Sequence, residues 1–102
     1  MRTRYVLRLY VAGKTPRSEE AIAQIRRFCE EDLKEECELR VIDTLDRPDL
    51  AAKDDVLVTP VLVKVSPPPV RRLVGDFSDR RVLLESLGIV RREGPREKAS
   101  DG

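Results

Sequence analysis

The side chains of this sequence that could do thiol or metal chemistry are two cysteines. Cys29 and Cys37 are separated by seven residues, and the chain contains no histidine. A zinc site built from cysteine and histidine is therefore excluded, and we expect neither a metal nor a cofactor. Two thiols leave two interpretations. We favour a pair of buried or half-buried structural cysteines, and the alternative is a redox-sensitive pair.

The overall charge and hydropathy exclude several other classes of function. The 102 residues carry 20 basic and 19 acidic side chains, for a net charge of +1. The net charge is therefore too small to attract the chain to nucleic acid or to an anionic membrane. The chain also has only four aromatic residues on which bases could stack. No apolar run approaches the roughly 20 residues of a membrane span, and residues 1–4 lead straight into strand-like sequence without a signal peptide. We expect a cytoplasmic protein.

The length and the hydropathy pattern predict one domain over residues 1–90. Its hydrophobic content of 40% suffices for one modest core. Residues 91–102, "RREGPREKASDG", contain almost nothing apolar, and we expect them to form a disordered charged tail.

The first half of the sequence predicts a strand, a helix and a second strand. Residues 5–12, "YVLRLYVA", are apolar apart from Arg8 and are typical of a central strand buried on both faces. Thr15 can cap a helix that begins at Pro16, because proline loses no hydrogen bond at the first helical position. Residues 38–43, "ELRVID", form the next strand. Such a crossover is right-handed and places its two strands parallel.

The second half predicts a short helix, a hairpin and a final helix. The short helix covers residues 48–54, and strands over 58–65 and 70–74 flank three prolines, which favour an antiparallel pair. Ser78 can cap the last helix, Phe77 can pack as a hydrophobic staple on Val82, and Gly88 can end the helix in a left-handed conformation.

Pro60 opens the third predicted strand, where a backbone donor is normally needed. The predicted order βαβαββα is that of a thioredoxin-like α/β fold, with a mixed four-stranded sheet and three helices. In that arrangement a proline preceded by threonine commonly begins the third strand with a cis peptide bond, as the Thr59–Pro60 sequence suggests. The catalytic Cys-x-x-Cys of such redox enzymes would occupy residues 13–16, which read Gly-Lys-Thr-Pro. We therefore expect a binding protein and not an enzyme.

Three stretches carry a family resemblance: "LRLYVAGKTPRS", "LRVIDTLDRPDLA" and "VTPVLVKVSPPPVRRLVGDFSDR". They resemble the KaiB family, the small clock proteins of cyanobacteria and their relatives, over about residues 5–84. The resemblance implies a non-catalytic adaptor that binds the ATPase ring of KaiC. In cyanobacterial clocks it also implies capture of KaiA and competition for KaiC with a histidine kinase whose sensor domain is KaiB-like.

The same resemblance implies two alternative folds, a resting tetramer and a thioredoxin-like monomer that engages KaiC. Val58, Val61 and Val63 stand where relatives commonly carry Ala, Thr and Ala, and β-branched residues favour strands over helices. Ser86 and Gly88 stand where relatives commonly carry Gly and Asp. Ser86 thus removes a glycine from the interior of the last helix, and Gly88 provides a residue at which that helix can end. We expect the thioredoxin-like, mainly monomeric state, with the tetramer as the alternative.

Five residues are candidates for binding the partner. Four of them match basic positions of the family pattern, namely Arg40, Lys64, Arg71 and Arg72, and Asp76 follows the matching glycine. A basic patch on a nearly neutral protein can steer it to an acidic surface, although any one of these charges could simply be solvated. Glu19 and Glu20 make the first helix more acidic than expected for cyanobacterial relatives, which favours KaiC binding over KaiA capture. The alternative functions are a thioredoxin-like redox protein and an oligomeric scaffold in KaiC-linked stress signalling.

Overall fold

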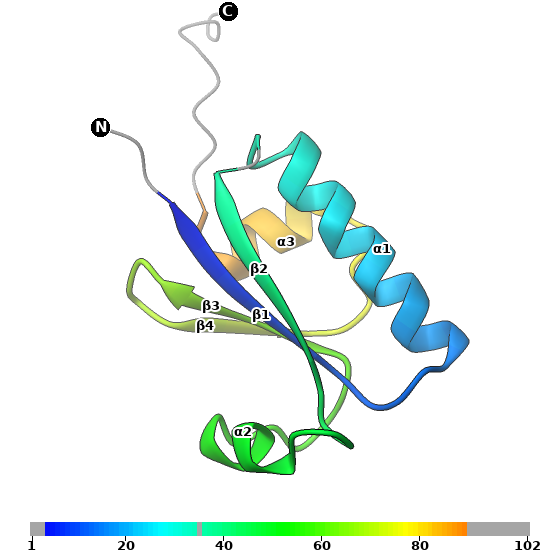
Figure 1. The fold of residues 1–102 in the computed structure, drawn as a ribbon. Helices are drawn as coiled ribbons and strands as arrows, with labels where there is room; N and C mark the ends of the chain where they lie inside the picture. Colours follow the sequence, from blue (N-terminus) through cyan, green and yellow to red (C-terminus); the bar gives the residue numbers. More distant parts are fainter. Residues whose placement is uncertain (1–3, 35, 90–102) are drawn as a thin grey trace, which may run out of the picture.

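The computed structural model of the chain describes residues 4–34 and 36–89, so the tail expected over 91–102 lies outside the described residues. The elements are β1 (Tyr5–Val11), α1 (Pro16–Glu31), β2 (Cys37–Asp43), α2 (Pro48–Lys53), β3 (Val61–Ser66), β4 (Arg71–Val74) and α3 (Arg80–Leu87). Figure 1 shows α1 and α3 on one side of the sheet and α2 at its opposite side. The predicted order βαβαββα is confirmed.

The four strands form one mixed sheet in the order β2-β1-β3-β4. β1 pairs in parallel with β2, and β3 runs antiparallel to both β1 and β4. The parallel crossover and the antiparallel hairpin are therefore both confirmed. β1 is a central strand, as its nearly continuous apolar sequence predicts.

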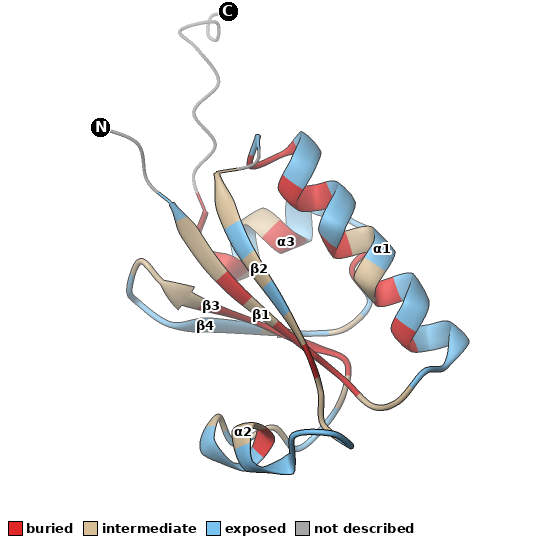
Figure 2. Ribbon diagram, viewed as in Figure 1, coloured by how far each residue is buried: buried red, intermediate tan, exposed pale blue. Residues whose placement is uncertain are grey.

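Alternate residues of β1 enter two separate cores. Leu7, Leu9 and Val11 pack with the inner faces of α1 and α3 in the larger core, which contains Ile25 and Leu83. Figure 2 shows the buried positions of α1 turned toward the sheet and its exposed positions turned away. The larger core therefore depends on helices from both halves of the chain.

The opposite face of the sheet carries a smaller core. Tyr10, Ile42, Val61 and Val63 are buried there, and Leu50 of α2 packs against them. The six residues of α2 cover only part of this face. Exposed side chains therefore remain around α2, and they are the basis of the surface described below.

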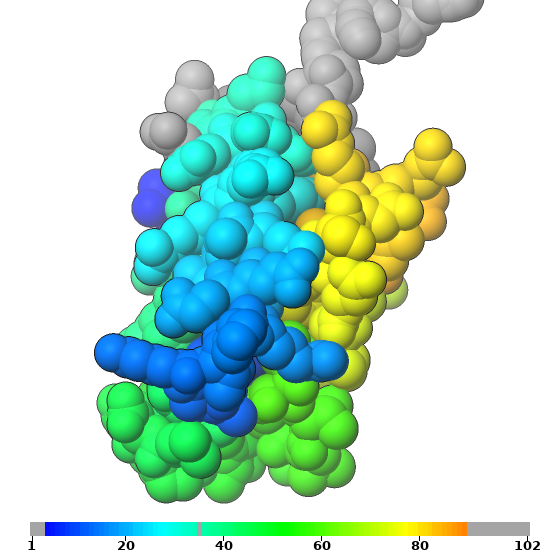
Figure 3. Space-filling view, turned by 90° about the vertical axis from the view of Figure 1, so that its right-hand side faces the viewer, coloured from blue at the N-terminus to red at the C-terminus, as the bar shows by residue number. Residues whose placement is uncertain are grey.

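The two larger helices contact one another beside the sheet. Arg80 at the start of α3 places its Nε 3.2 Å from Oδ2 of the buried Asp32, just after the end of α1. Figure 3 shows α1 and the segment that leads into α3 side by side on this face of the molecule. The ion pair attaches the end of the βαβ half to the last helix.

The start of α1 is capped as the sequence predicts. The Oγ1 of Thr15 accepts a hydrogen bond of 3.1 Å from the amide of Ser18, and Pro16 is the first helical residue. The hydroxyl satisfies an amide that has no partner within the helix.

The start of α3 differs from the prediction by one residue, so the assignment of Ser78 as the cap is wrong. Asp79 caps the helix, and its Oδ1 accepts from the amides of Arg81 at 2.9 Å and Val82 at 3.3 Å. Asp76 accepts a bond of 3.0 Å from the amide of Ser78 and so holds that residue in the preceding turn. Because Asp79 is the cap, Phe77 does not stand directly before it as the predicted staple requires, and Phe77 is buried while Val82 is 41% exposed.

The end of α3 and the entry to β3 follow the sequence closely. Gly88 ends α3 with φ of 67°, which confirms the predicted left-handed stop. The Thr59–Pro60 peptide bond is cis, as predicted. β3 begins only at Val61, three residues later than the 58–65 prediction, because residues 58–60 form the bend that carries this proline. A Cβ on Gly75 would lie 2.7 Å from Cγ of Pro60, so the sharp turn after β4 requires glycine there.

A polar contact attaches α2 to the sheet. Arg8 Nη1 lies 2.9 Å from Oδ2 of Asp54, which also accepts a hydrogen bond from the Tyr10 hydroxyl. Burial alone would raise the pKa of Asp54, but the bonds from Tyr10 and Arg8 outweigh it and hold the pKa below its ordinary value. Arg72 donates to the backbone carbonyls of Asp54 and Asp55, so β4 holds the same segment.

Replacing Asp79 by Ala is expected to lower the free energy of unfolding by about 1 kcal/mol, because two amides of α3 lose their acceptor. Ser78→Ala is the matched control, and it should change stability by less than about 0.5 kcal/mol. Urea denaturation of both variants measures the difference. Equal costs for the two substitutions would contradict Asp79 as the cap.

Asp54→Asn is expected to cost about 1–2 kcal/mol at pH 7, since Arg8 loses a charged partner at a half-buried site. The depressed pKa of Asp54 means that this stabilisation is complete above its ordinary value of 3.8 and is lost as pH falls through the folded-state pKa. The gap between wild type and Asp54→Asn should therefore close in acid. Asp49→Asn, in an exposed pair with Arg47, should cost much less than Asp54→Asn in the same denaturation series.

Candidate partner-binding surface

Strand register places three arginines in one row across the sheet. Arg8 of β1 pairs with Arg40 of β2 on one side and with Val63 of β3 on the other, and Val63 pairs with Arg72 of β4. Directly paired residues point to the same face of a sheet, so the three arginines share the face that carries α2. We call Arg8, Arg40 and Arg72 the arginine row.

The members of the arginine row differ in how far their charges are already neutralised. Arg8 is held by Asp54, which raises the pKa of its guanidinium, and Arg72 is exposed but bonds to two backbone carbonyls. Arg40 is exposed on the edge strand and has no salt bridge to another residue of the part that the structure describes. Arg40 therefore carries the charge most available to a partner.

Lys64, another predicted site residue, lies on the other face and is only 2% exposed. Its Nζ donates to the carbonyls of Pro67 at 2.5 Å and Pro69 at 2.9 Å, and burial together with the nearby Arg71 lowers its pKa. In this conformation Lys64 therefore supports the proline turn between β3 and β4 and does not reach the surface.

Arg71 and Asp76 are exposed but lie away from the arginine row. Arg71 pairs with Lys64 and so shares its face, where the Arg71 guanidinium approaches Gly88 at the end of α3. Asp76 lies in the turn before α3, where hydrogen bonds from Ser78 lower its pKa. Of the five candidates, the structure thus places Arg40 and Arg72 on the same face, at the two edge strands of the sheet, and places the other three elsewhere.

Sequence reasoning missed two parts of this surface. Arg8 is the one charged residue in an otherwise apolar strand. That pattern could have indicated that Arg8 pairs with an acidic side chain, which in the structure is Asp54. Val74, two residues after Arg72 on β4, shares its face and is 54% exposed, and Leu57 in the loop before β3 is 92% exposed. The alternation of Val70, Arg72 and Val74 in "VRRLV" could have indicated an apolar component beside the charges.

The residues that would carry redox chemistry in thioredoxin-like enzymes form a different site here. Gly13 adopts φ of 74°, and its amide donates to Oδ1 of Asp43, while Thr15 uses its hydroxyl to cap α1. A shallow pocket of about 240 Å³ lies beside Pro60 and is lined by Arg17, Asp76 and Phe77 among others. Neither Cys29 nor Cys37 lines this pocket, because both lie in the α1/β2 pocket described below.

Two further features bear on the class of function. Within residues 4–34 and 36–89, the structure contains no cluster of three or more histidine, cysteine or acidic side chains that could hold a metal ion. No helix in the same ranges has the length and hydropathy to span a membrane.

Comparison with known protein families matches a KaiB domain to residues 8–89 of this chain. The circadian clock oscillator protein KaiB of Prochlorococcus marinus (strain MIT 9312) is 47% identical over 89 residues, which cover 87% of this chain and 85% of that protein. The circadian clock protein KaiB3 of Synechocystis sp. is 45% identical over 87 residues, 85% of each chain.

Solved structures agree with the fold. The N-terminal domain of SasA from Synechococcus elongatus superposes with a TM-score of 0.66 at 26% identity and covers 86% of this chain and 87% of its own. Mitochondrial thioredoxin 3 from Saccharomyces cerevisiae reaches the same TM-score of 0.66 at 11% identity, over 85% of this chain and 79% of its own, which supports the fold alone. The sequence resemblance is thereby confirmed, and the chain belongs to the KaiB family of circadian clock proteins.

Proposed function

We propose that this protein is a non-catalytic adaptor that docks on the ATPase ring of a KaiC-like partner. The family relationship supplies the class of partner, and the thioredoxin-like conformation is the one that the family resemblance associates with KaiC binding. The observation that carries the proposal is the arginine row beside α2, in which Arg40 is left without a salt bridge to any described residue.

The partner surface that fits the arginine row is acidic with an apolar component. Arg40 and Arg72 offer planar guanidinium groups to carboxylates, and such contacts are directional because both nitrogens can bond at once. Val74 adds exposed apolar area on the same face and strand as Arg72, and apolar anchors beside charged contacts are typical of protein interfaces. The net charge of +1 gives little global attraction, so steering would come from this local patch.

The thiol-free start of α1 supports a docking role over disulfide exchange. Thr15 and Pro16 occupy the positions where a nucleophilic thiol would benefit from the helix N-terminus, and the Thr15 hydroxyl is already engaged in the cap. Capture of KaiA and competition with a KaiB-like sensor kinase remain secondary parts of the proposal, for hosts that contain those partners.

Arg40→Glu is expected to weaken binding to a KaiC-like ATPase by about tenfold or more, because a repelling charge replaces a free cation at the interface. Pull-down or interferometry with purified KaiC and ATP measures the change, and wild-type affinity should fall as salt rises. Arg27→Glu on the exposed side of α1 is the matched control and should alter affinity less than about twofold.

The binding experiment tests the adaptor role and the choice of surface separately. If the wild-type chain does not bind KaiC, the adaptor role is contradicted. If wild type binds and Arg40→Glu binds equally well, the adaptor role stands and the arginine row is the wrong surface.

The chain is expected to be a monomer at rest in the thioredoxin-like fold. Val61 and Val63 are buried in β3 of this fold and Gly88 ends α3, so these three residues suit the described elements. Val58 lies in the bend before β3 and is 53% exposed, so the strand expected there does not include it. Size-exclusion chromatography with light scattering should give a single-chain mass. Backbone chemical shifts should show strands over 61–66 and 71–74, and a predominant tetramer with helical shifts there would contradict the expectation.

A further inference from the structure

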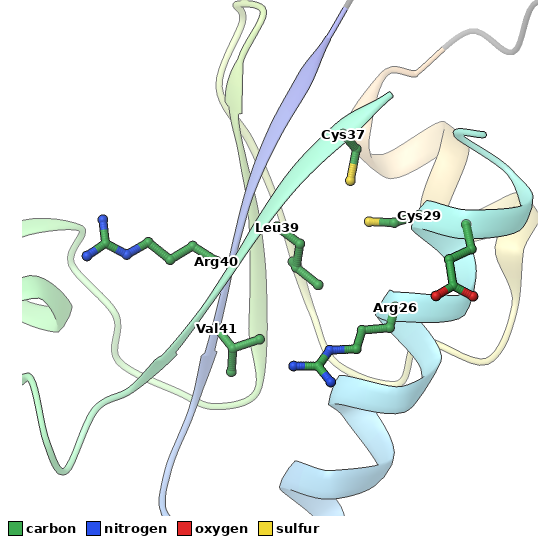
Figure 4. Close-up of a pocket in the computed structure, with 7 residues that line it drawn as sticks. Arg26, Cys29, Cys37, Leu39, Arg40 and Val41 are labelled. Atoms are coloured by element: carbon green, nitrogen blue, oxygen red, sulfur yellow. The ribbon is translucent and has the colours of Figure 1, made fainter. Parts of the chain in front are cut away.

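The two cysteines of the chain face one another across the gap between a helix and the edge strand. Cys29 lies on the inner side of α1 and Cys37 is the first residue of β2, and Figure 4 shows their sulfur atoms pointing toward each other. Both are free thiols, and Cys37 packs against the hydrophobic core that contains Cys29. Nothing in the proposed docking role uses this pair.

The pair opens onto a surface pocket. The pocket has a volume of about 560 Å³ and is lined by both cysteines together with Arg26, Glu30, Leu39, Arg40 and Val41. Figure 4 shows the Arg26 side chain extending from α1 along this pocket, whereas Arg40 points away from the cysteines. A small molecule can therefore reach the thiols through a pocket whose lining includes the Arg26 cation.

The two thiols are chemically unequal. Cys29 is buried, and its hydrogen bond with Cys37, together with burial, raises the pKa of its thiol. The same bond, helped by the positive charge of Arg4, lowers the pKa of the half-buried Cys37. Because the thiolate is the attacking form in disulfide exchange, Cys37 is the nucleophile of the pair and Cys29 the resolving thiol.

We infer that Cys29 and Cys37 form a redox-active dithiol, which a low-molecular-weight disulfide of the glutathione type oxidises reversibly to an internal disulfide between α1 and β2. The Cys37 thiolate attacks one sulfur of the oxidant, forms a mixed disulfide and releases one thiolate. Cys29 then loses its proton to solvent and attacks the Cys37 sulfur, which forms the internal bond and releases the second thiol. Two protein thiols are oxidised while one molecule of disulfide is reduced to two thiols.

The geometry favours the second step over a stable adduct. Once Cys37 is held in the mixed disulfide, its thiolate no longer accepts the hydrogen bond that is the main cause raising the pKa of Cys29. The Cys29 sulfur already faces the Cys37 sulfur, so the resolving thiol starts on the side from which it must attack. The site is thus an internal dithiol and differs from a cysteine that is merely capped by glutathione.

The test treats the folded full-length chain with oxidised glutathione at neutral pH and follows it by intact-mass spectrometry and thiol alkylation. We expect wild type to lose the mass of two hydrogens, to become unreactive to alkylation at both positions, and to recover both thiols with a reducing agent. Oxidation should also raise the Tm by several degrees, because the new bond closes a short loop of the chain.

Two single variants trap or block the pathway. Cys29→Ser should accumulate the mixed disulfide on Cys37, and Cys37→Ser should react at least tenfold more slowly than wild type, since only the buried thiol remains. Circular dichroism checks that both variants retain the fold, and unfolding the variants in guanidinium should bring their two rates close together. The inference is overturned if wild type stays reduced, stops at the glutathione adduct, or forms only disulfide-linked dimers.

Discussion

The strict alternation of side chains along β1 is the constraint on which the rest of the structure depends. Leu7, Leu9 and Val11 require one covering layer, and Arg8 and Tyr10 require another of different chemistry. The first layer is supplied by α1 and α3, whereas the second is a six-residue helix attached through Asp54. A short helix leaves much of that face open, and for this reason the arginine row lies at the surface and not in a core.

Features set by local sequence were predictable. The Thr15 cap with Pro16 and the Gly88 stop each depend on a few neighbouring residues whose conformational preferences are strong. The cis bond before Pro60 was predicted from the arrangement of the fold. The cap of α3 was assigned to the wrong residue, because "DFSD" contains several neighbouring side chains that can accept a hydrogen bond from a backbone amide. The choice between Ser78 and Asp79 was decided by Asp76, which holds Ser78 in the turn.

The membership of the candidate site was less predictable, because it depends on register between distant strands. Arg71 and Arg72 are adjacent in sequence, yet a shift of one residue in a strand moves a side chain to the other face. Lys64 illustrates the same point: a lysine in a valine-rich strand resembles a surface charge, but its carbonyl acceptors come from the prolines that follow it. The pairing of Arg8 with Asp54 joins residues 46 positions apart, and only the packing of α2 brings them together.

β2 is the element that connects the two proposals. Cys37, Leu39 and Val41 line the pocket against α1, and the Arg40 side chain turns to the face that carries α2. As an edge strand, β2 is held in the sheet by β1 alone, so its contacts with α1 make up much of its remaining support. A covalent bond at Cys37 would tie one end of the strand to α1 while Arg40 stays free to meet a carboxylate. Arg40 also lines the cysteine pocket, but its side chain points away from the cysteines, so thiol chemistry and docking would use opposite faces of the strand.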